Sequence, residues 1–168
     1  MIDWTKVNHF LPKEFPEDPD LYASEEIIYA LDKFRRILGK RIFPSKASGA
    51  LARLTGSPDS QHYALDREST AVDFFCEGSP IEAFHMMLLS KCFTGIGIYL
   101  CTNGNDGLPW VMFHGDVRDT HTTIPKIWIV ERIAGTDRYR YPQRLPQYWE
   151  LFRDKRLYVP RFNFVDHR

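Results

Sequence analysis

The stretch Ala71-Val72-Asp73-Phe74-Phe75 is an apolar run interrupted by a single carboxylate. Short runs of this kind, bounded by polar segments, are typical of a strand, and this one would carry Asp73 into a pocket. Burying an unpaired carboxylate costs several kcal/mol, and a bound metal ion offsets that cost. The stretch therefore predicts both a strand and a metal-binding side chain on it.

The sequence predicts one helix on each side of this strand. Ser24 can cap a helix whose first turn is acidic and which ends before Gly39. Apolar residues recur within it at helical spacing, at Ile27, Ile28, Leu31, Phe34, Ile37 and Leu38. Downstream, Ser79-Pro80-Ile81-Glu82 forms a capping box with proline at the first helical position. We expect the second helix over residues 80–92.

The remaining chain predicts a hairpin and several shorter elements. Residues 95–101 and 110–114 favour strands separated by the turn-rich stretch 103–107. We also expect an extended arm at 1–23, a strand or short helix followed by a loop at 41–60, a strand at 127–130 and a short helix at 146–155.

Composition excludes several classes of protein. Lys plus Arg and Asp plus Glu are equal at 22 each, so bulk charge favours neither nucleic acid nor a membrane surface as partner. The three cysteines do not occur as CxxC, which argues against a disulfide framework or a cysteine zinc site. The start of the chain lacks the pattern of a signal peptide, so we expect synthesis in the cytoplasm. With 168 residues, the chain 1–168 suits one domain.

Three residues have the chemistry of a catalytic zinc site. His62 ends a loop, Asp73 interrupts its strand, and His114 ends another apolar run. Two imidazoles and a carboxylate that converge on one ion leave the fourth tetrahedral position for water. We therefore predict a metal site formed by His62, Asp73 and His114.

Three segments, in order, resemble the zinc-dependent D-Ala-D-Ala carboxypeptidases of peptidase family M15, which share a fold with the Hedgehog signalling domain. Ser60-Gln61-His62 followed by Ala71-Val72-Asp73 resembles the motif SxHxxGxAxD. Residues 95–99 resemble GxGxY, and residues 110–118 resemble (W/F)xHxDxR. The resemblance implies Zn²⁺ as cofactor and an α+β fold with a small, mainly antiparallel sheet, helices packed on one side, and the metal in an open groove over the sheet.

The chain departs from the family pattern at three places. Lys46 stands where the family often has a substrate-binding arginine, and we expect it to stabilise an oxyanion or hold a substrate carboxylate. Residues 63–72 separate the first two ligands with four more residues than the motif has, which a surface loop accommodates at small entropic cost. Val111 replaces the glutamate of the ExxH motif found in several branches.

Several other residues near the predicted ligands allow two interpretations. Asp116 is a candidate catalytic base, or it orients a ligand histidine and pairs with Arg118. Ser60, Tyr99 and Trp110 are candidate substrate-binding residues, although Ser60 could close a turn and the two aromatic residues could be core or cleft wall. His85 and His121 are not assigned to the site.

The resemblance implies hydrolysis of a peptide bond in peptidoglycan, either at a D-Ala-D-Ala end or at an L-Ala-D-Glu or cross-bridge link. Family members of this length are frequent in bacteriophages, as endolysins or wall-degrading virion proteins. The alternative is a phage structural or wall-binding module that keeps the fold without turnover, and the missing ExxH glutamate favours it. Neither reading specifies an oligomeric state.

Overall fold

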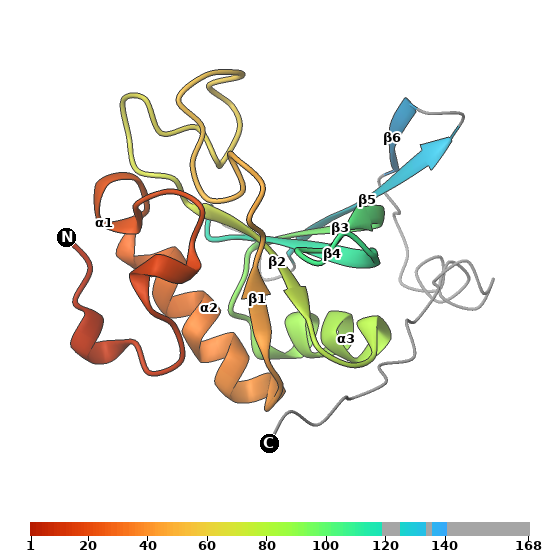
Figure 1. Cartoon of the computed structure of the whole chain (residues 1–168), viewed down its shortest axis with the longest axis horizontal. Coiled ribbons are helices and arrows are strands. Elements are labelled where there is room, and N and C mark those ends of the chain that lie inside the picture. The colour runs from red at the N-terminus through yellow and green to blue at the C-terminus, as the bar shows by residue number, and fades with distance from the viewer. Residues whose placement is uncertain (119–124, 134–135, 141–168) are drawn as a thin grey trace.

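The computed structural model describes residues 1–118, 125–133 and 136–140 (Figure 1). Six strands form one sheet in the order β1-β2-β4-β3-β5-β6. Their bounds are Ile42–Pro44 for β1, Ala71–Cys76 for β2, Gly95–Asn103 for β3, Pro109–Asp116 for β4, Lys126–Ile133 for β5 and Thr136–Arg140 for β6. The predicted strands and the β3–β4 hairpin are therefore confirmed, and the predicted helix at 146–155 lies outside the described residues.

The sheet is mixed. Four of its strand pairs are antiparallel, whereas β3 and β5 run parallel. One row of the register crosses four strands, from Asp73 on β2 through His114 on β4 and Gly97 on β3 to Trp128 on β5. This row brings together two predicted ligands that are 41 positions apart in the chain.

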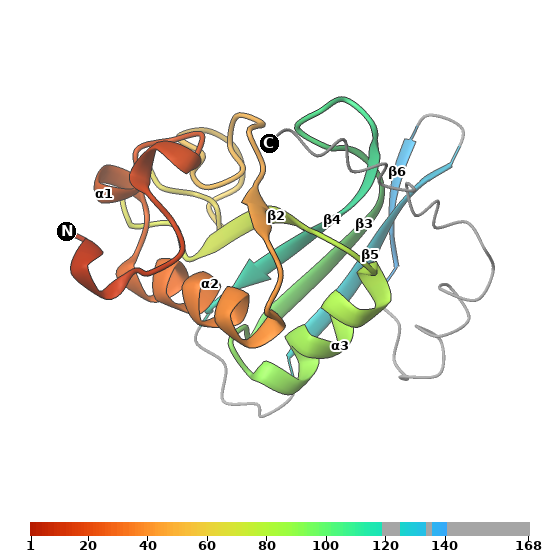
Figure 2. The ribbon, with the colours of Figure 1, turned by 60° about the horizontal axis from the view of Figure 1, so that its bottom comes forward.

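Two helices cover one face of the sheet (Figures 1 and 2). Helix α2 spans Glu25–Leu38, begins where the Ser24 hydroxyl accepts from the Ile27 amide, and ends at Gly39 in the left-handed conformation. Helix α3 spans Pro80–Ser90 and begins at the Ser79 cap. Both helices were predicted, α3 ending two residues earlier than expected. The α+β class is confirmed.

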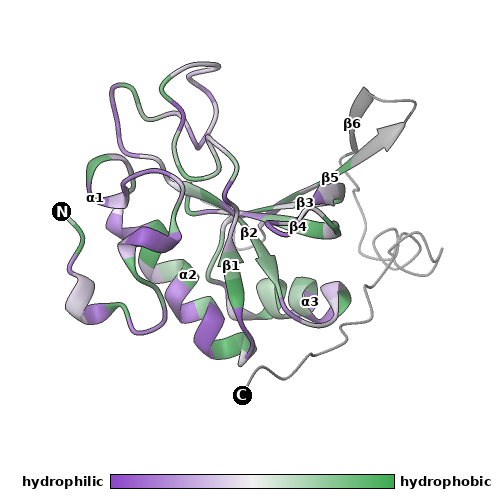
Figure 3. Ribbon diagram, viewed as in Figure 1, coloured by the Kyte–Doolittle hydropathy of each residue, from purple (hydrophilic) through white to green (hydrophobic). Residues whose placement is uncertain are grey.

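The apolar core lies between these helices and the sheet. Alternation along β2 and β4 turns Val72, Phe74, Val111 and Phe113 toward the helices, and all four are buried. Helix α2 combines hydrophilic and hydrophobic residues, as a helix with one solvent-facing side does, whereas α3 is mostly hydrophobic (Figure 3). The opposite sheet face carries Asp73 and His114.

The N-terminal arm is more regular than the predicted extended segment. It contains two 3₁₀ turns, η1 at Trp4–Lys6 and η2 at Pro12–Glu14, and the short helix α1 at Pro19–Tyr22. Both η2 and α1 begin with proline, which is preorganised for the first position of a helical turn. The arm packs onto the core through buried Ile2, Phe10 and Phe15.

The segment between β1 and β2 lies on the other side of the sheet from the helices (Figure 1). It is a loop, as predicted, held by an isolated bridge between Arg53 and Tyr63 and another between Ala23 and Ser69. His62 is on this segment, so the loop brings the third predicted ligand over the sheet. Among the residues described, no helix has the length and apolar character needed to span a bilayer.

Candidate metal centre

His62, Asp73 and His114 converge on one point and are all buried. His62 Nε2 lies 3.2 Å from Asp73 Oδ1 and 3.0 Å from His114 Nδ1. His114 Nδ1 lies 3.0 Å from the same Asp73 oxygen. The three atoms therefore form a nearly equilateral triangle, with Asp73 and His114 contributed by the sheet and His62 by the loop.

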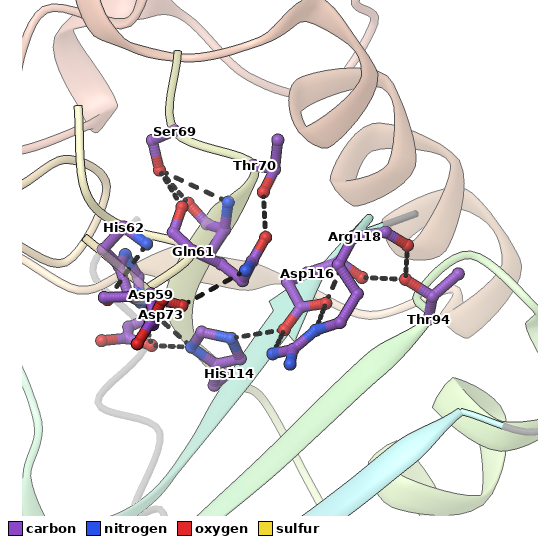
Figure 4. Close-up of polar contacts among 12 residues, drawn as sticks. Asp59, Gln61, His62, Ser69, Thr70, Asp73, Thr94, His114, Asp116 and Arg118 are labelled. Carbon is purple, nitrogen blue, oxygen red and sulfur yellow. Dashed lines mark hydrogen bonds and ion pairs between the residues drawn. The ribbon is translucent and has the colours of Figure 1, made fainter. Parts of the chain in front are cut away.

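The outer nitrogen of each histidine faces a hydrogen-bond acceptor. His62 Nδ1 lies 3.3 Å from the Leu51 carbonyl oxygen. His114 Nε2 lies 3.1 Å from Asp116 Oδ2 (Figure 4). When these outer nitrogens carry the protons, the inner nitrogens present lone pairs to the centre of the triangle. Partners of this kind fix the tautomer and ring orientation of metal-binding histidines.

The triangle has the size that a tetrahedral zinc site requires. Zinc bonds of about 2.0–2.1 Å to nitrogen and oxygen place neighbouring ligand atoms roughly 3.3 Å apart. The observed separations of 3.0 to 3.2 Å are close to that value. Two nitrogen lone pairs and a carboxylate oxygen at this separation repel one another unless a cation or a proton lies between them. The cluster can therefore bind a metal ion.

The charges of the cluster are strongly coupled. Burial raises the pKa of Asp73, but nearby His62 and His114 outweigh burial, and the net pKa lies below the ordinary value. Burial lowers the pKa of His114, but its hydrogen bonds with Asp116 and Asp73 outweigh burial and the net pKa is raised. A proton on His114 would place a positive charge beside the Asp73 carboxylate, 3.0 Å away.

Asp116 lies on the side of His114 away from Asp73 (Figure 4). Its carboxylate is fully buried, contacts His114 through Oδ2, and accepts from Arg118 through both oxygens. Burial raises its pKa, but Arg118 and His114 outweigh burial and lower the pKa to about 2. This is the position of a group that orients a ligand histidine, the second of the two roles considered for it.

Two glycines of β3 make room for the groups around His114. A Cβ atom built at Gly95 would overlap the Asp116 carboxylate. A Cβ atom built at Gly97 would lie 2.7 Å from the Trp128 ring, and that ring packs on His114 with 4.9 Å between ring centroids. The Gly-x-Gly spacing thus has a physical reason, because both glycines lie beneath residues that support the same ligand.

A cavity of about 240 Å³ lies beside the cluster. Its lining residues are Arg53, Asp59, Ser60, Gln61, His62, Tyr99, His114, Arg118, Lys126 and Trp128. Ser60 and Tyr99, two of the predicted substrate-binding residues, thus line the cavity beside the candidate metal cluster. His62 and His114 line this cavity, so it adjoins the side of the triangle that these two histidines form.

The structure places Lys46 and Trp110 elsewhere. Lys46 Nζ donates to the backbone carbonyls of Lys13 and Glu14 in the N-terminal arm, at 3.2 and 2.6 Å. Trp110 lines a separate pocket with Phe43 and Phe75. Neither residue lines the cavity beside the candidate metal cluster.

Arg53 is a cavity residue that sequence reasoning missed. Its Nη2 lies 3.9 Å from Asp73 Oδ2, and its side chain is about half exposed. The Arg53 amide donates to the His62 carbonyl at 2.6 Å, and this bond holds two stretches of the loop side by side. No local pattern marks Arg53, since only this pairing between distant parts of the loop brings it to the site.

Glu17 fastens the arm to the loop that supports the ligands. Its carboxylate accepts from the amides of Gly49, Leu51 and Ala52 at 2.6, 3.1 and 3.2 Å. The same stretch supplies the Leu51 carbonyl that faces His62 and the Ala50 carbonyl that accepts from the Asp73 amide. Glu17 therefore holds the backbone that positions two of the three ligands.

We predict that Glu17→Gln lowers stability by about 1–3 kcal/mol, because its amide group brings a donor against backbone donors and leaves some of them unpaired. Metal affinity should fall as well, since the loop beneath His62 loses its anchor. Glu68→Gln, at an exposed position of the same loop region, is the matched control and should behave like wild type. Urea denaturation without metal and a zinc titration measure the two effects; unchanged values for Glu17→Gln would contradict the anchoring role.

Comparison with known proteins adds no identification: no family model, curated protein or solved structure matches this chain. The class of site is therefore defined by the chain's own geometry, a buried cluster of two histidines and one aspartate beside an open cavity on an α+β fold.

Proposed function

We propose that the protein is a zinc metallopeptidase related to peptidase family M15, with a Hedgehog/DD-peptidase-like fold, that cleaves a peptide bond of bacterial peptidoglycan. The observation that carries the proposal is the triangle of His62 Nε2, His114 Nδ1 and Asp73 Oδ1, which has one side open to a cavity. Three motif-like segments in family order support the choice of family. From the same resemblance we propose that the protein acts in phage lysis or as a wall-degrading part of a virion.

Zinc in this cluster would polarise the scissile carbonyl and activate a water molecule. The chain's own residues have the remaining tasks. Arg53 and Lys126 are cations on the cavity wall that can stabilise a developing oxyanion or bind a substrate carboxylate. We assign this role to Arg53 in place of Lys46, because the Lys46 ammonium is bonded to the arm.

The proton transfer requires a carboxylate that reaches the cavity. Asp116 is enclosed by His114 and Arg118, and its lowered pKa makes it a weak proton acceptor. Asp59 lies on the cavity lining and is exposed, so we assign the acid/base role to it. General acid–base catalysis contributes about 10²–10⁴-fold, which is the loss of kcat expected for Asp59→Asn.

Hydrolysis of purified sacculi tests the proposal. Zinc-loaded protein should release new amino and carboxyl ends, a chelator should abolish the release, and added zinc should restore it. Asp73→Asn, which replaces a ligand with a group of the same shape, serves as the inactive control. If no type of cell wall gives chelator-sensitive release of new ends, the peptidase proposal is refuted.

The alternative is a non-catalytic wall-binding module. Two observations favour it, Val111 at the position of the ExxH glutamate and the full engagement of Asp116 with its neighbours. In that case the protein would sediment with sacculi in a metal-dependent manner without releasing new ends.

A further inference from the structure

A second pocket lies on the same sheet face as the candidate metal cluster. This aromatic pocket has a volume of about 240 Å³ and is lined by Phe43, Phe75, Asn105, Asp106 and Trp110. Phe75 follows Asp73 by two positions on β2, and Phe43 on β1 is its cross-strand partner. Trp110 precedes His114 by four positions on β4. Because side chains alternate along a strand and cross-strand partners share a face, all three rings project from the face that carries the cluster.

The walls of the aromatic pocket suit a methylene chain that ends in a cation. The Trp110 ring packs edge-on against Phe43 and Phe75, with centroids 6.3 and 5.9 Å apart. Phe75 is buried, whereas Phe43 and Trp110 are only partly buried. Aromatic rings offer apolar surface to methylene groups, and their faces attract cations because they carry partial negative charge. The Phe43 ring already makes one such contact outside the pocket lining, with the Arg41 guanidinium 5.0 Å from its centroid.

The aromatic pocket also carries a negative charge. Of the described residues that line it, Asp106 is the only charged one. Its exposed carboxylate accepts from the Trp110 indole through Oδ2 at 3.2 Å and from the Leu108 amide through Oδ1 at 3.0 Å. A carboxylate has about four lone-pair positions, so these bonds leave room for a further donor. Within residues 1–118, 125–133 and 136–140, no lysine or arginine forms an ion pair with Asp106. The charge is therefore available to a cationic ligand.

Polar contacts hold the walls of the aromatic pocket in place. Asn105 ties the turn after β3 to the end of β1, since its side chain donates to the Pro44 carbonyl at 3.1 Å and accepts from the Lys46 amide at 2.9 Å. A Cβ atom at Gly104 would overlap the Trp110 indole, so glycine allows the ring to lie on the turn. The pocket is therefore formed before any ligand arrives, which lowers the entropic cost of binding.

We propose that the aromatic pocket binds the aminoalkyl side chain of the diamino acid in the stem peptide of peptidoglycan. Its methylene groups lie against the aromatic rings, and its terminal ammonium group lies beside Asp106 and the Trp110 ring. The inference rests on the proposed function for the identity of the ligand as a stem peptide. The volume is below the roughly 300–1,000 Å³ of pockets that enclose whole drug-sized ligands, so a single side chain is the fitting occupant.

The position of the aromatic pocket relative to the candidate metal cluster fits this residue of the stem. The diamino acid lies between the glutamate and the terminal D-Ala-D-Ala, so at a D-Ala-D-Ala end it is the second residue before the scissile bond. An extended peptide advances about 7 Å in two residues, and the same strand rise separates Phe75 from Asp73 along β2. With the scissile bond at the cluster, the side chain of the diamino acid therefore reaches the pocket.

The test uses binding in the absence of metal, so that it does not depend on catalysis. The probes are N-acetyl-L-lysinamide, N-acetyl-L-norleucinamide, which has the same side chain without the ammonium group, and N-acetylglycinamide. The indole N–H resonance of Trp110, assigned with Trp110→Phe, reports on occupancy. We expect a saturable shift with the lysine probe, about threefold or more weaker binding of the norleucine probe at low salt, and the weakest binding for the glycine probe. No shift with the lysine probe, or a norleucine probe that binds as tightly, would overturn the inference.

Asp106→Asn locates the charge that selects the lysine probe. It should bring the affinity of the lysine probe down to that of the norleucine probe, whereas Asp66→Asn, at an exposed position of the loop between β1 and β2, should behave like wild type. Each variant's fold is checked by its amide spectrum. Added salt makes the same comparison in the wild-type protein, since screening should weaken the lysine probe and leave the norleucine probe unchanged. A preference for lysine that survives both changes would contradict the role of Asp106.

A second arm separates this inference from the proposed function. Zinc-loaded protein is incubated with sacculi, and the release of new amino and carboxyl ends is measured. If the lysine probe binds as expected but no ends are released, the pocket is retained as an amine-binding site and the zinc peptidase fails. If zinc-dependent release occurs and Trp110 does not respond to the lysine probe, the peptidase is retained and the pocket fails.

Discussion

Replacing Asp73 with Asn is expected to reduce zinc content from about one ion per chain to nearly none. The anionic oxygen at 3.0 to 3.2 Å from both imidazoles is the only ligand of the proposed set that carries a full charge. Without that charge the site offers two neutral nitrogens and an amide, which bind zinc poorly. Elemental analysis after dialysis and a competitive chelator titration measure the loss.

His62→Ala should have the same consequence for zinc, because it removes the ligand supplied by the loop. His85→Ala is the matched control, since His85 is on α3 in the layer on the opposite side of the sheet (Figure 1). It should retain the zinc content of wild type. Unchanged zinc content in both ligand variants would refute the metal centre, whatever the activity of the protein.

Gly97→Ala is expected to destabilise the fold by about 1–3 kcal/mol and to weaken zinc binding by about 10–100-fold. The added methyl group would lie 2.7 Å from the Trp128 ring, which must then move from its place against His114. The Arg118 guanidinium lies over the same ring, 5.5 Å from its centroid, so the displacement also reaches the partner of Asp116. Denaturation of the metal-free protein and zinc titration measure the two losses.

The double variant Gly97→Ala with Trp128→Leu distinguishes a specific clash from a general intolerance of β3. Leucine withdraws the ring atoms that the new methyl group would meet, so the two substitutions should be less costly together than the sum of their separate effects. The expected coupling is about 0.5–3 kcal/mol, the range seen for residues in contact. Additive losses would show that the close approach of Trp128 is not the reason for glycine at position 97.

Local patterns were sufficient for α2, α3 and the strands β2 to β5, whereas β6 and the helical turns of the N-terminal arm were not predicted. The caps at Ser24 and Ser79 and the spacing of apolar residues specify α2 and α3, because a helix is stabilised by groups three and four positions apart. Asp73 was recognisable because a carboxylate within an apolar strand needs a compensating charge. His62 and His114 were identified from motif-like segments, and the structure brings them together with Asp73.

Contacts between distant segments decided the rest. The parallel pairing of β5 with β3 places Trp128 beside His114, and nothing within residues 127–130 specifies a partner or a direction. The places of Lys46 and Arg53 also depend on distant segments. Backbone carbonyls of the N-terminal arm bind Lys46, whereas the backbone pairing of Arg53 with His62 brings Arg53 to the cavity.

By itself, then, the sequence determined the helices α2 and α3, the strands β2 to β5 and which side chains have the chemistry to bind a cation. These properties depend on a residue's own type and on neighbours within a few positions of the chain. Only the tertiary structure decided that Arg53 and not Lys46 lines the cavity. It also decided which nitrogen of each histidine points to the centre of the cluster and where the aromatic rings gather. Those outcomes depend on strand register and on contacts between residues far apart in the chain, such as those of the Glu17 carboxylate with the amides of Gly49 and Leu51. No single stretch of sequence contains both residues of such a contact.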